Sequence, residues 1–209
     1  MRNLLLLLLS VTLLGCYGRL KREAPHMADV KTQVFDPARP AVRLDTPRDG
    51  SAVGIVVDAY QTGQAIRVAR RIEGAVEVPG ISHALERGIG EGLDGGPPFA
   101  HTTERQADGT LQLEVLRWGL EVPRLGAPGH FTYRVRVRLF RKDGRRIYRQ
   151  RVRCDTAAGA PPEISMVLGT VNNVRQLEEM PDEELQAAFE EVARWCGMEV
   201  ARRIRQHAG

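Results

Sequence analysis

The residues best suited to chemistry are six arginines that lie between residues 131 and 154. Those in Phe131–Leu139 alternate with apolar residues, and this two-residue period predicts a strand with one buried face. A second run with the same alternation follows Asp143-Gly144. Asp-Gly between two such runs predicts a β-hairpin closed by a type I′ turn. The six are Arg134, Arg136, Arg138, Arg149, Arg151 and Arg153.

We call these six residues the arginine face. A two-residue loop at Asp143-Gly144 places each arginine of the first strand opposite an arginine of the second, and Tyr133 opposite Cys154. Like charges directly opposite each other destabilise a sheet by roughly 0.2–1 kcal/mol per pair. Water, carboxylates of the same chain or an anionic ligand must therefore offset the repulsion. Guanidinium groups bind both carboxylates and phosphates, so the arginine face is a candidate anion- or partner-binding surface. The alternative is a solvated or internally paired face, to which Glu114 could contribute if a bulge places it there.

The first sixteen residues carry an export pattern. A positively charged start precedes the apolar run Leu4–Leu14, which is too short to span a membrane as a helix and predicts a secretory signal peptide over residues 1–15. Its end, Leu13-Leu14-Gly15-Cys16, resembles the lipobox of bacterial lipoproteins. The resemblance implies cleavage before Cys16 and attachment of acyl chains such as palmitate to that residue. An ordinary signal peptide with an incidental cysteine is the alternative.

The same resemblance implies a location. Several acyl chains give stable anchoring, whereas a single chain gives only marginal membrane binding. Enteric lipoproteins that stay in the inner membrane carry an aspartate after the lipidated cysteine, and this chain carries Tyr17 there. We therefore expect an anchor in the outer membrane, with the protein on the periplasmic face.

Composition limits the partners and the domain organisation. The formal net charge of +4 is modest, so we expect no nucleic-acid partner. Residues 16–51 contain dispersed prolines and mixed charges, which predicts a lipidated tether with a short edge strand near residues 30–35. Such a tether would span roughly 33 Å. Residues 52–209 suit a single domain.

Two cysteines remain after lipidation of Cys16. Cys154 lies on the apolar side of its predicted strand, and Cys196 lies on the apolar stripe of the last predicted helix. An even number of cysteines in an oxidising compartment favours a Cys154–Cys196 disulfide. Two buried thiols are the alternative.

The remaining patterns predict an α+β fold. Residues 52–60 form an apolar run typical of a buried strand. Residues 65–78 fit either a strand or a helix, and we favour a strand that pairs with the preceding run. Residues 110–154 predict an antiparallel meander with a β-bulge near residues 115–117, where the apolar side switches. A helix that begins at Pro181 should pack against this sheet.

No pattern indicates catalysis. The serines that follow the signal peptide lie outside nucleophile motifs. The histidines are dispersed without metal-ligand spacing. We therefore expect no metal, no cofactor and no enzymatic activity. A lipid-anchored envelope hydrolase with an unrecognised active site is the alternative. The residues concerned are Ser51, Ser82, Ser165, His26, His83, His101, His130 and His207.

The chain thus predicts a non-catalytic lipoprotein of the outer membrane. Its layout of a small sheet and a final helix behind a lipobox resembles lipoproteins that assist lipopolysaccharide assembly and lipid transport. That resemblance implies a supporting role in an envelope assembly or lipid-transport complex. The arginine face would then bind either a protein partner or an anionic lipid.

Overall fold

The computed structural model describes residues 18–35, 37, 39–44, 52–94, 96–122, 129–156 and 174–209. The predicted signal peptide and Cys16 lie outside this range. The strands are β1 (Asp29–Phe35), β2 (Ala41–Leu44), β3 (Ala100–Thr102), β4 (Gly109–Val122), β5 (His130–Arg141) and β6 (Arg146–Asp155). The helices are η1 (Ala24–His26), α2 (Ala52–Ala75), α3 (Val78–Leu93), α5 (Val174–Glu179) and α6 (Asp182–Ala208), and a helical segment over 18–23 precedes η1.

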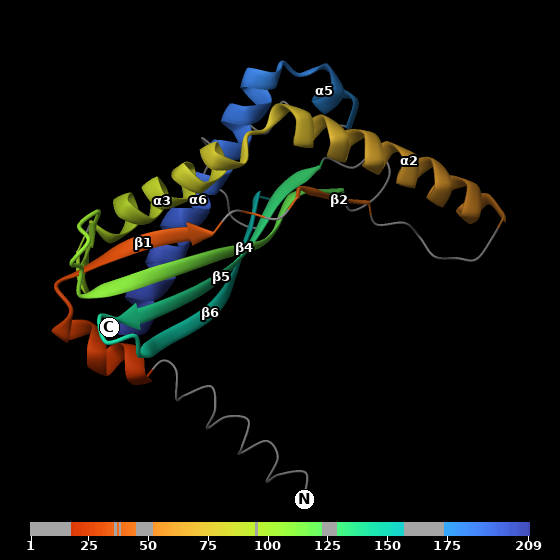
Figure 1. The fold of residues 1–209 in the computed structure, drawn as a ribbon. Helices are drawn as coiled ribbons and strands as arrows, with labels where there is room; N and C mark the ends of the chain where they lie inside the picture. The colour runs from red at the N-terminus through yellow and green to blue at the C-terminus, as the bar shows by residue number, and fades with distance from the viewer. Residues whose placement is uncertain are drawn as a thin grey trace, which may run out of the picture.

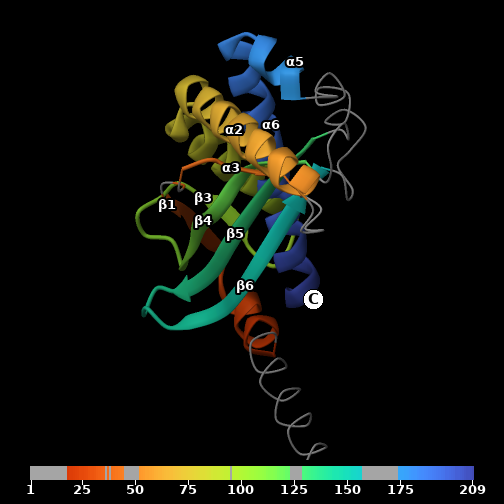
Figure 2. The ribbon, with the colours of Figure 1, turned by 90° about the vertical axis from the view of Figure 1, so that its right-hand side faces the viewer.

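One sheet organises the fold, with strand order β3-β1-β4-β5-β6 and β2 also beside β4. The pairs β4–β5 and β5–β6 are antiparallel, which confirms the predicted meander. Strand β1 runs parallel to β3 and β4, and β2 runs parallel to β4. Helices α3 and α6 lie together on one side of the sheet (Figures 1 and 2). The predicted α+β class, with the last helix packed on the sheet, is confirmed.

The predicted register of the β5–β6 hairpin is confirmed. Tyr133 pairs with Cys154, and Arg136 pairs with Arg151. The turn differs from the prediction, because Gly144 has a positive φ and Asp143 does not. A type I′ turn needs positive φ at both positions. Instead the register shifts beyond Leu139, which makes the loop longer than two residues.

The predicted bulge is also present. The register of β4 against β5 shifts between Val115 and Arg117, so Leu116 is the extra residue. Val115 on one side of the shift and Trp118 on the other are both buried. The bulge thus keeps apolar residues in the core on both sides of the irregularity.

The predicted strand pair over 52–78 is wrong, because α2 occupies residues 52–75. The strand and helix patterns share Val68 and Ile72, and both side chains are fully buried. Only the strand pattern also requires Ile66 to be buried, and Ile66 is 47% exposed. The helical stripe therefore decides the local structure. None of the described helices combines the length and the apolar character needed to cross a membrane.

Residues 18–44 do not form the expected tether. Leu20, Ala24 and Val30 are fully buried in the core. Strand β1 lies between β3 and β4 and is not an edge strand. The prolines of this segment mark the ends of elements, since Pro25 stands in the first turn of η1 and Pro37 lies between β1 and β2. Only Tyr17 separates Cys16 from the first described residue, Gly18.

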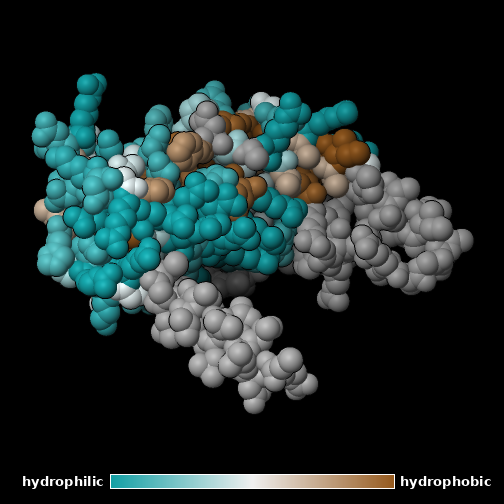
Figure 3. Space-filling view, turned by 60° about the horizontal axis from the view of Figure 1, so that its bottom comes forward, coloured by the Kyte–Doolittle hydropathy of each residue, from teal (hydrophilic) through white to brown (hydrophobic). Residues whose placement is uncertain are grey.

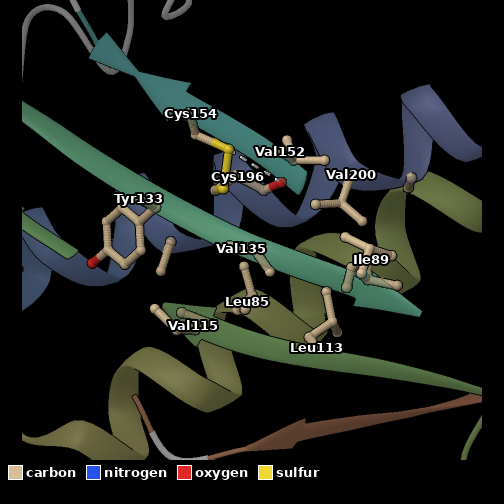
Figure 4. Packing of buried hydrophobic residues seen from close by; sticks show 14 of the residues in the cluster. Leu85, Ile89, Leu113, Val115, Tyr133, Val135, Val152, Cys154, Cys196 and Val200 are labelled. Carbon is tan, nitrogen blue, oxygen red and sulfur yellow. Dashed lines mark hydrogen bonds between the residues drawn. A yellow bond between two sulfur atoms is a disulfide. The ribbon is translucent and has the colours of Figure 1, made fainter. Parts of the chain in front are cut away.

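Helix α6 is attached to the sheet and packs closely on α3. A disulfide joins Cys154 of β6 to Cys196 of α6, as expected, and apolar residues of β4, β5, α3 and α6 surround it (Figure 4). A Cβ atom at Gly88 of α3 would collide with the carbonyl oxygen of Arg194, and one at Gly197 of α6 would collide with that of Leu85. The glycines therefore allow the two helix backbones to approach each other.

This packing predicts a sharp difference between two glycine substitutions. Gly88→Ala should lower the free energy of unfolding by about 1–3 kcal/mol or more, because the backbone of α6 must move. Gly74→Ala in α2 is the matched control: nothing lies within 4 Å of its added Cβ, so stability should stay unchanged or rise by about 0.4–1 kcal/mol. Urea denaturation measures both, and equal effects would contradict the close approach of α3 and α6.

Candidate anion-binding face

The side of the sheet opposite α3 and α6 carries the arginine face. The register also aligns Arg117 of β4 with Arg134 of β5 and Arg153 of β6 in one row across three strands. Sequence reasoning missed Arg117, because this residue reaches the outer side only through the bulge. The register of β4 beyond the shift is the information that would have placed it.

Glu114 neutralises part of this face. Arg136 donates to both of its carboxylate oxygens, at 2.9 and 2.8 Å, and Arg138 donates to Oε2 at 3.1 Å. The Arg136 side chain is only 20% exposed, so its charge is partly withdrawn from water. The expected contribution of Glu114 to internal pairing is thus present.

A second group of partners lies at the far end of the strands. Arg153 donates to Glu121 and to Asp155, each at 2.8 Å. His130 Nε2 lies 3.8 Å from Glu121 and 3.6 Å from Asp155. Sequence reasoning did not bring these residues together, although the pairing of Glu121 with His130 follows from the register of β4 and β5.

Two carboxylates and an imidazole are also ligand types that suit a divalent metal ion, and their ligand atoms lie within 4.8 Å of one another. Arg153 already occupies one oxygen of each carboxylate. We therefore interpret Glu121, His130, Arg153 and Asp155 as an ion-pair cluster that covers the end of the arginine face.

Arg149 and Arg151 differ from the other arginines. Both are exposed on β6, and neither forms an ion pair with another residue in the part of the chain that the structure describes. With Arg117 the outer side carries seven arginines, and the carboxylates that pair with them there are Glu114, Glu121 and Asp155. Among the described residues, internal pairing thus accounts for part of the face and leaves a positive surplus at Arg117, Arg149 and Arg151, of which Arg149 and Arg151 are the exposed ones.

The groups with perturbed pKa values lie elsewhere. Burial raises the pKa of Tyr133, and the charge of Glu190 raises it further. The Tyr133 hydroxyl donates to the carbonyl of Phe189 at 3.0 Å. Burial lowers the pKa of His207, and the charge of Arg203 lowers it further. The Nδ1 atom of His207 lies 2.9 Å from the Tyr148 hydroxyl. Both arrangements belong to the contact between α6 and the sheet.

A hollow of about 380 Å³ opens between η1 and the β5–β6 turn, with His26, Asp108 and Lys142 in its wall. Asp108 accepts a hydrogen bond from the Ala28 N–H at 2.8 Å, and the Asp108 N–H donates to Asp29 at 2.9 Å. Asp108 therefore joins the start of β1 to the start of β4. Of the two acids in the wall of the hollow, Asp108 is more buried than Asp143, and this structural role explains its position.

Comparison with known proteins assigns no family. No family model matches the chain, and no curated protein matches it. Among solved structures, protein XCC0632 of Xanthomonas campestris, of the DUF330 family, is 11% identical, with a TM-score of 0.41 over 84% of this chain and 81% of that one. Lipoprotein GNA1162 of Neisseria meningitidis is 13% identical, with a TM-score of 0.26 over 73% of this chain and 99% of that one.

The hypothetical protein CT253 of Chlamydia trachomatis is 11% identical, with a TM-score of 0.37 over 80% of this chain and 98% of that one. All three TM-scores lie below 0.5, so these similarities establish neither a shared fold nor a shared function. The functional argument therefore depends on the residues of this chain alone.

Proposed function

We propose that this chain is a non-catalytic lipoprotein of the outer membrane, anchored through Cys16 on the periplasmic side. Its arginine face binds an acidic surface of a protein partner and so supports an envelope assembly. The observation that supports binding of an acidic partner is the positive charge of Arg149 and Arg151, which are exposed and lack internal ion pairs among the described residues.

The spacing of these two arginines suits a protein surface. They lie two residues apart on the same side of β6, which separates their Cα atoms by about 7 Å. Their cross-strand neighbours Arg136 and Arg138 are already held by Glu114, so the two exposed guanidinium groups lie beside side chains with fixed positions. Guanidinium groups form paired hydrogen bonds with carboxylates, which gives such a contact orientation as well as affinity.

The position of the anchor favours a protein over a lipid as ligand of this face. Residues 18–26 contact the β5–β6 turn through Glu23 and Arg141, so the anchored end and the turn lie together. From Arg146, where β6 begins, Arg149 and Arg151 lie about 10 and 17 Å further along the strand. An anchor at Cys16 thus leaves the two arginines some distance from the headgroups and accessible from the side.

The anchor itself predicts the result of a labelling experiment. Cells that express the full chain and are fed a clickable palmitate analogue should label the protein. The Cys16→Ser variant should be unlabelled, because no other cysteine follows a lipobox. Cys154 and Cys196 remain in both proteins and serve as the internal control. Equal labelling of the two proteins would show that Cys16 is not the acylated residue.

The partner predicts the result of affinity purification. The native full chain, captured from detergent-solubilised envelope, should recover an acidic protein, and the variant Arg149→Gln/Arg151→Gln should recover about tenfold less of it. The variant Lys21→Gln/Lys142→Gln loses the same charge elsewhere on the surface and should recover as much as the native protein. Recovery that is equal in all three proteins would contradict a role of the arginine face.

A further inference from the structure

The end of the domain next to the anchor is strongly basic. Its exposed side chains come from two segments that are far apart in the sequence, residues 18–26 and the β5–β6 turn. The acids of these two segments are Asp143, which is exposed, and Glu23, which is only 13% exposed. Asp108 lies between the segments, is half-buried and accepts a hydrogen bond from the Ala28 N–H. We call the following residues the basic end: Arg19, Lys21, Arg22, Lys142, Arg145 and Arg146, all exposed.

Buried contacts hold these two segments together. Leu20 and Ala24 are fully buried, which fixes the helical segment on the domain. Arg141 donates to Glu23 at 2.9 Å, and Arg145 lies 3.9 Å from the same carboxylate. Glu23 is thus occupied inside the contact, and the charges of the basic end remain on the outside in a fixed arrangement.

The surface agrees with this description. Figure 3 brings this end of the domain forward, and hydrophilic residues dominate the surface on the left of the view. Figure 1 shows the helical segment and the ends of β5 and β6 on the same side of the molecule. A contact made by this area would therefore depend on charge and not on the insertion of apolar side chains.

The length of chain before the helical segment fixes what the basic end can reach. Only Tyr17 lies between Cys16 and Gly18. Two residue steps of extended chain span at most about 7 Å. An acylated Cys16 lies at the surface of the bilayer, so the basic end would lie within reach of the lipid headgroups.

From this geometry we propose that the basic end is a membrane-docking surface that binds the anionic headgroups of the bilayer. Each lysine or arginine near an anionic membrane surface increases affinity about fivefold. Such docking would supplement the acyl chains and fix the orientation of the domain, with its strands pointing away from the membrane. The proposal rests on the proposed anchor at Cys16, and it assigns lipid to the basic end and protein to the arginine face.

Vesicle binding by the chain from Tyr17 to Gly209 tests the proposal without the lipid anchor. This chain contains every residue that the structure describes. It should bind vesicles of phosphatidylglycerol and phosphatidylethanolamine, release them as salt is raised, and not bind vesicles of phosphatidylcholine. Lys21→Gln/Lys142→Gln should weaken binding about 25-fold. The charge-matched control Arg149→Gln/Arg151→Gln should stay within about twofold of the unsubstituted chain.

Three outcomes would overturn the proposal: no binding by the unsubstituted chain, equal losses in the two variants, or a loss confined to the control. Equal losses would indicate attraction by net charge alone, and a loss confined to the control would assign the lipid to the arginine face. All four substituted side chains are exposed, so each variant should keep its unfolding midpoint in urea, which serves as the check of folding. Palmitate labelling reports on the anchor separately, so a failure of the anchor and a failure of the docking surface are distinguishable.

Discussion

The pairing of β5 with β6 is the constraint on which the rest of the structure depends. Because side chains alternate between the two faces of a sheet, a slip of one residue would turn the arginines into the core and Val135 and Val152 into solvent. Burial of the apolar side prevents that slip, and the Cys154–Cys196 disulfide ties the same side to α6. The glycine contacts between α6 and α3 then complete the layer that covers the sheet.

The same register creates the electrostatic character of the outer side. Arginines placed opposite one another repel, and the chain offsets this repulsion only in part, through Glu114 and through the cluster of Glu121 and Asp155. The charge that remains is concentrated on β6, at the edge of the sheet. A second basic surface arises at the basic end, where Glu23 holds the helical segment against the turn. The domain therefore presents two separate basic surfaces, one on the outer side of the sheet and one at the end formed by residues 18–26 and the β5–β6 turn.

Local patterns were sufficient for the elements whose partners lie close in the sequence. The alternation in Phe131–Leu139 and the Asp-Gly turn predicted the hairpin register. The change of the apolar residues from one side of β4 to the other predicted the bulge. The turn type was wrong because Asp143 keeps a negative φ and Gly144 alone supplies the left-handed residue. For α2, the strand and helix patterns shared Val68 and Ile72, so only the exposure of Ile66 distinguishes them.

Patterns failed where the partner is distant. Strand β1 pairs in parallel with β4, which follows it by about 80 residues in the sequence, and a local pattern does not indicate such a distant pairing. Its flanking prolines resembled those of a linker, although they only mark the ends of β1 and β2. Of the candidate site, the six arginines and their alignment followed from the sequence. Arg117 and the pairing of Glu121 with His130 required the register of β4 beyond the bulge.

The central claim is that the basic end faces the membrane while the arginine face remains accessible to a partner. Amide hydrogen exchange of the native lipidated chain, compared between anionic vesicles and detergent micelles, tests it most directly. Our account predicts that vesicles slow exchange over residues 18–26 and 141–146 and leave exchange over residues 149–153 unchanged. Slowed exchange over residues 149–153, with none at the basic end, would contradict it.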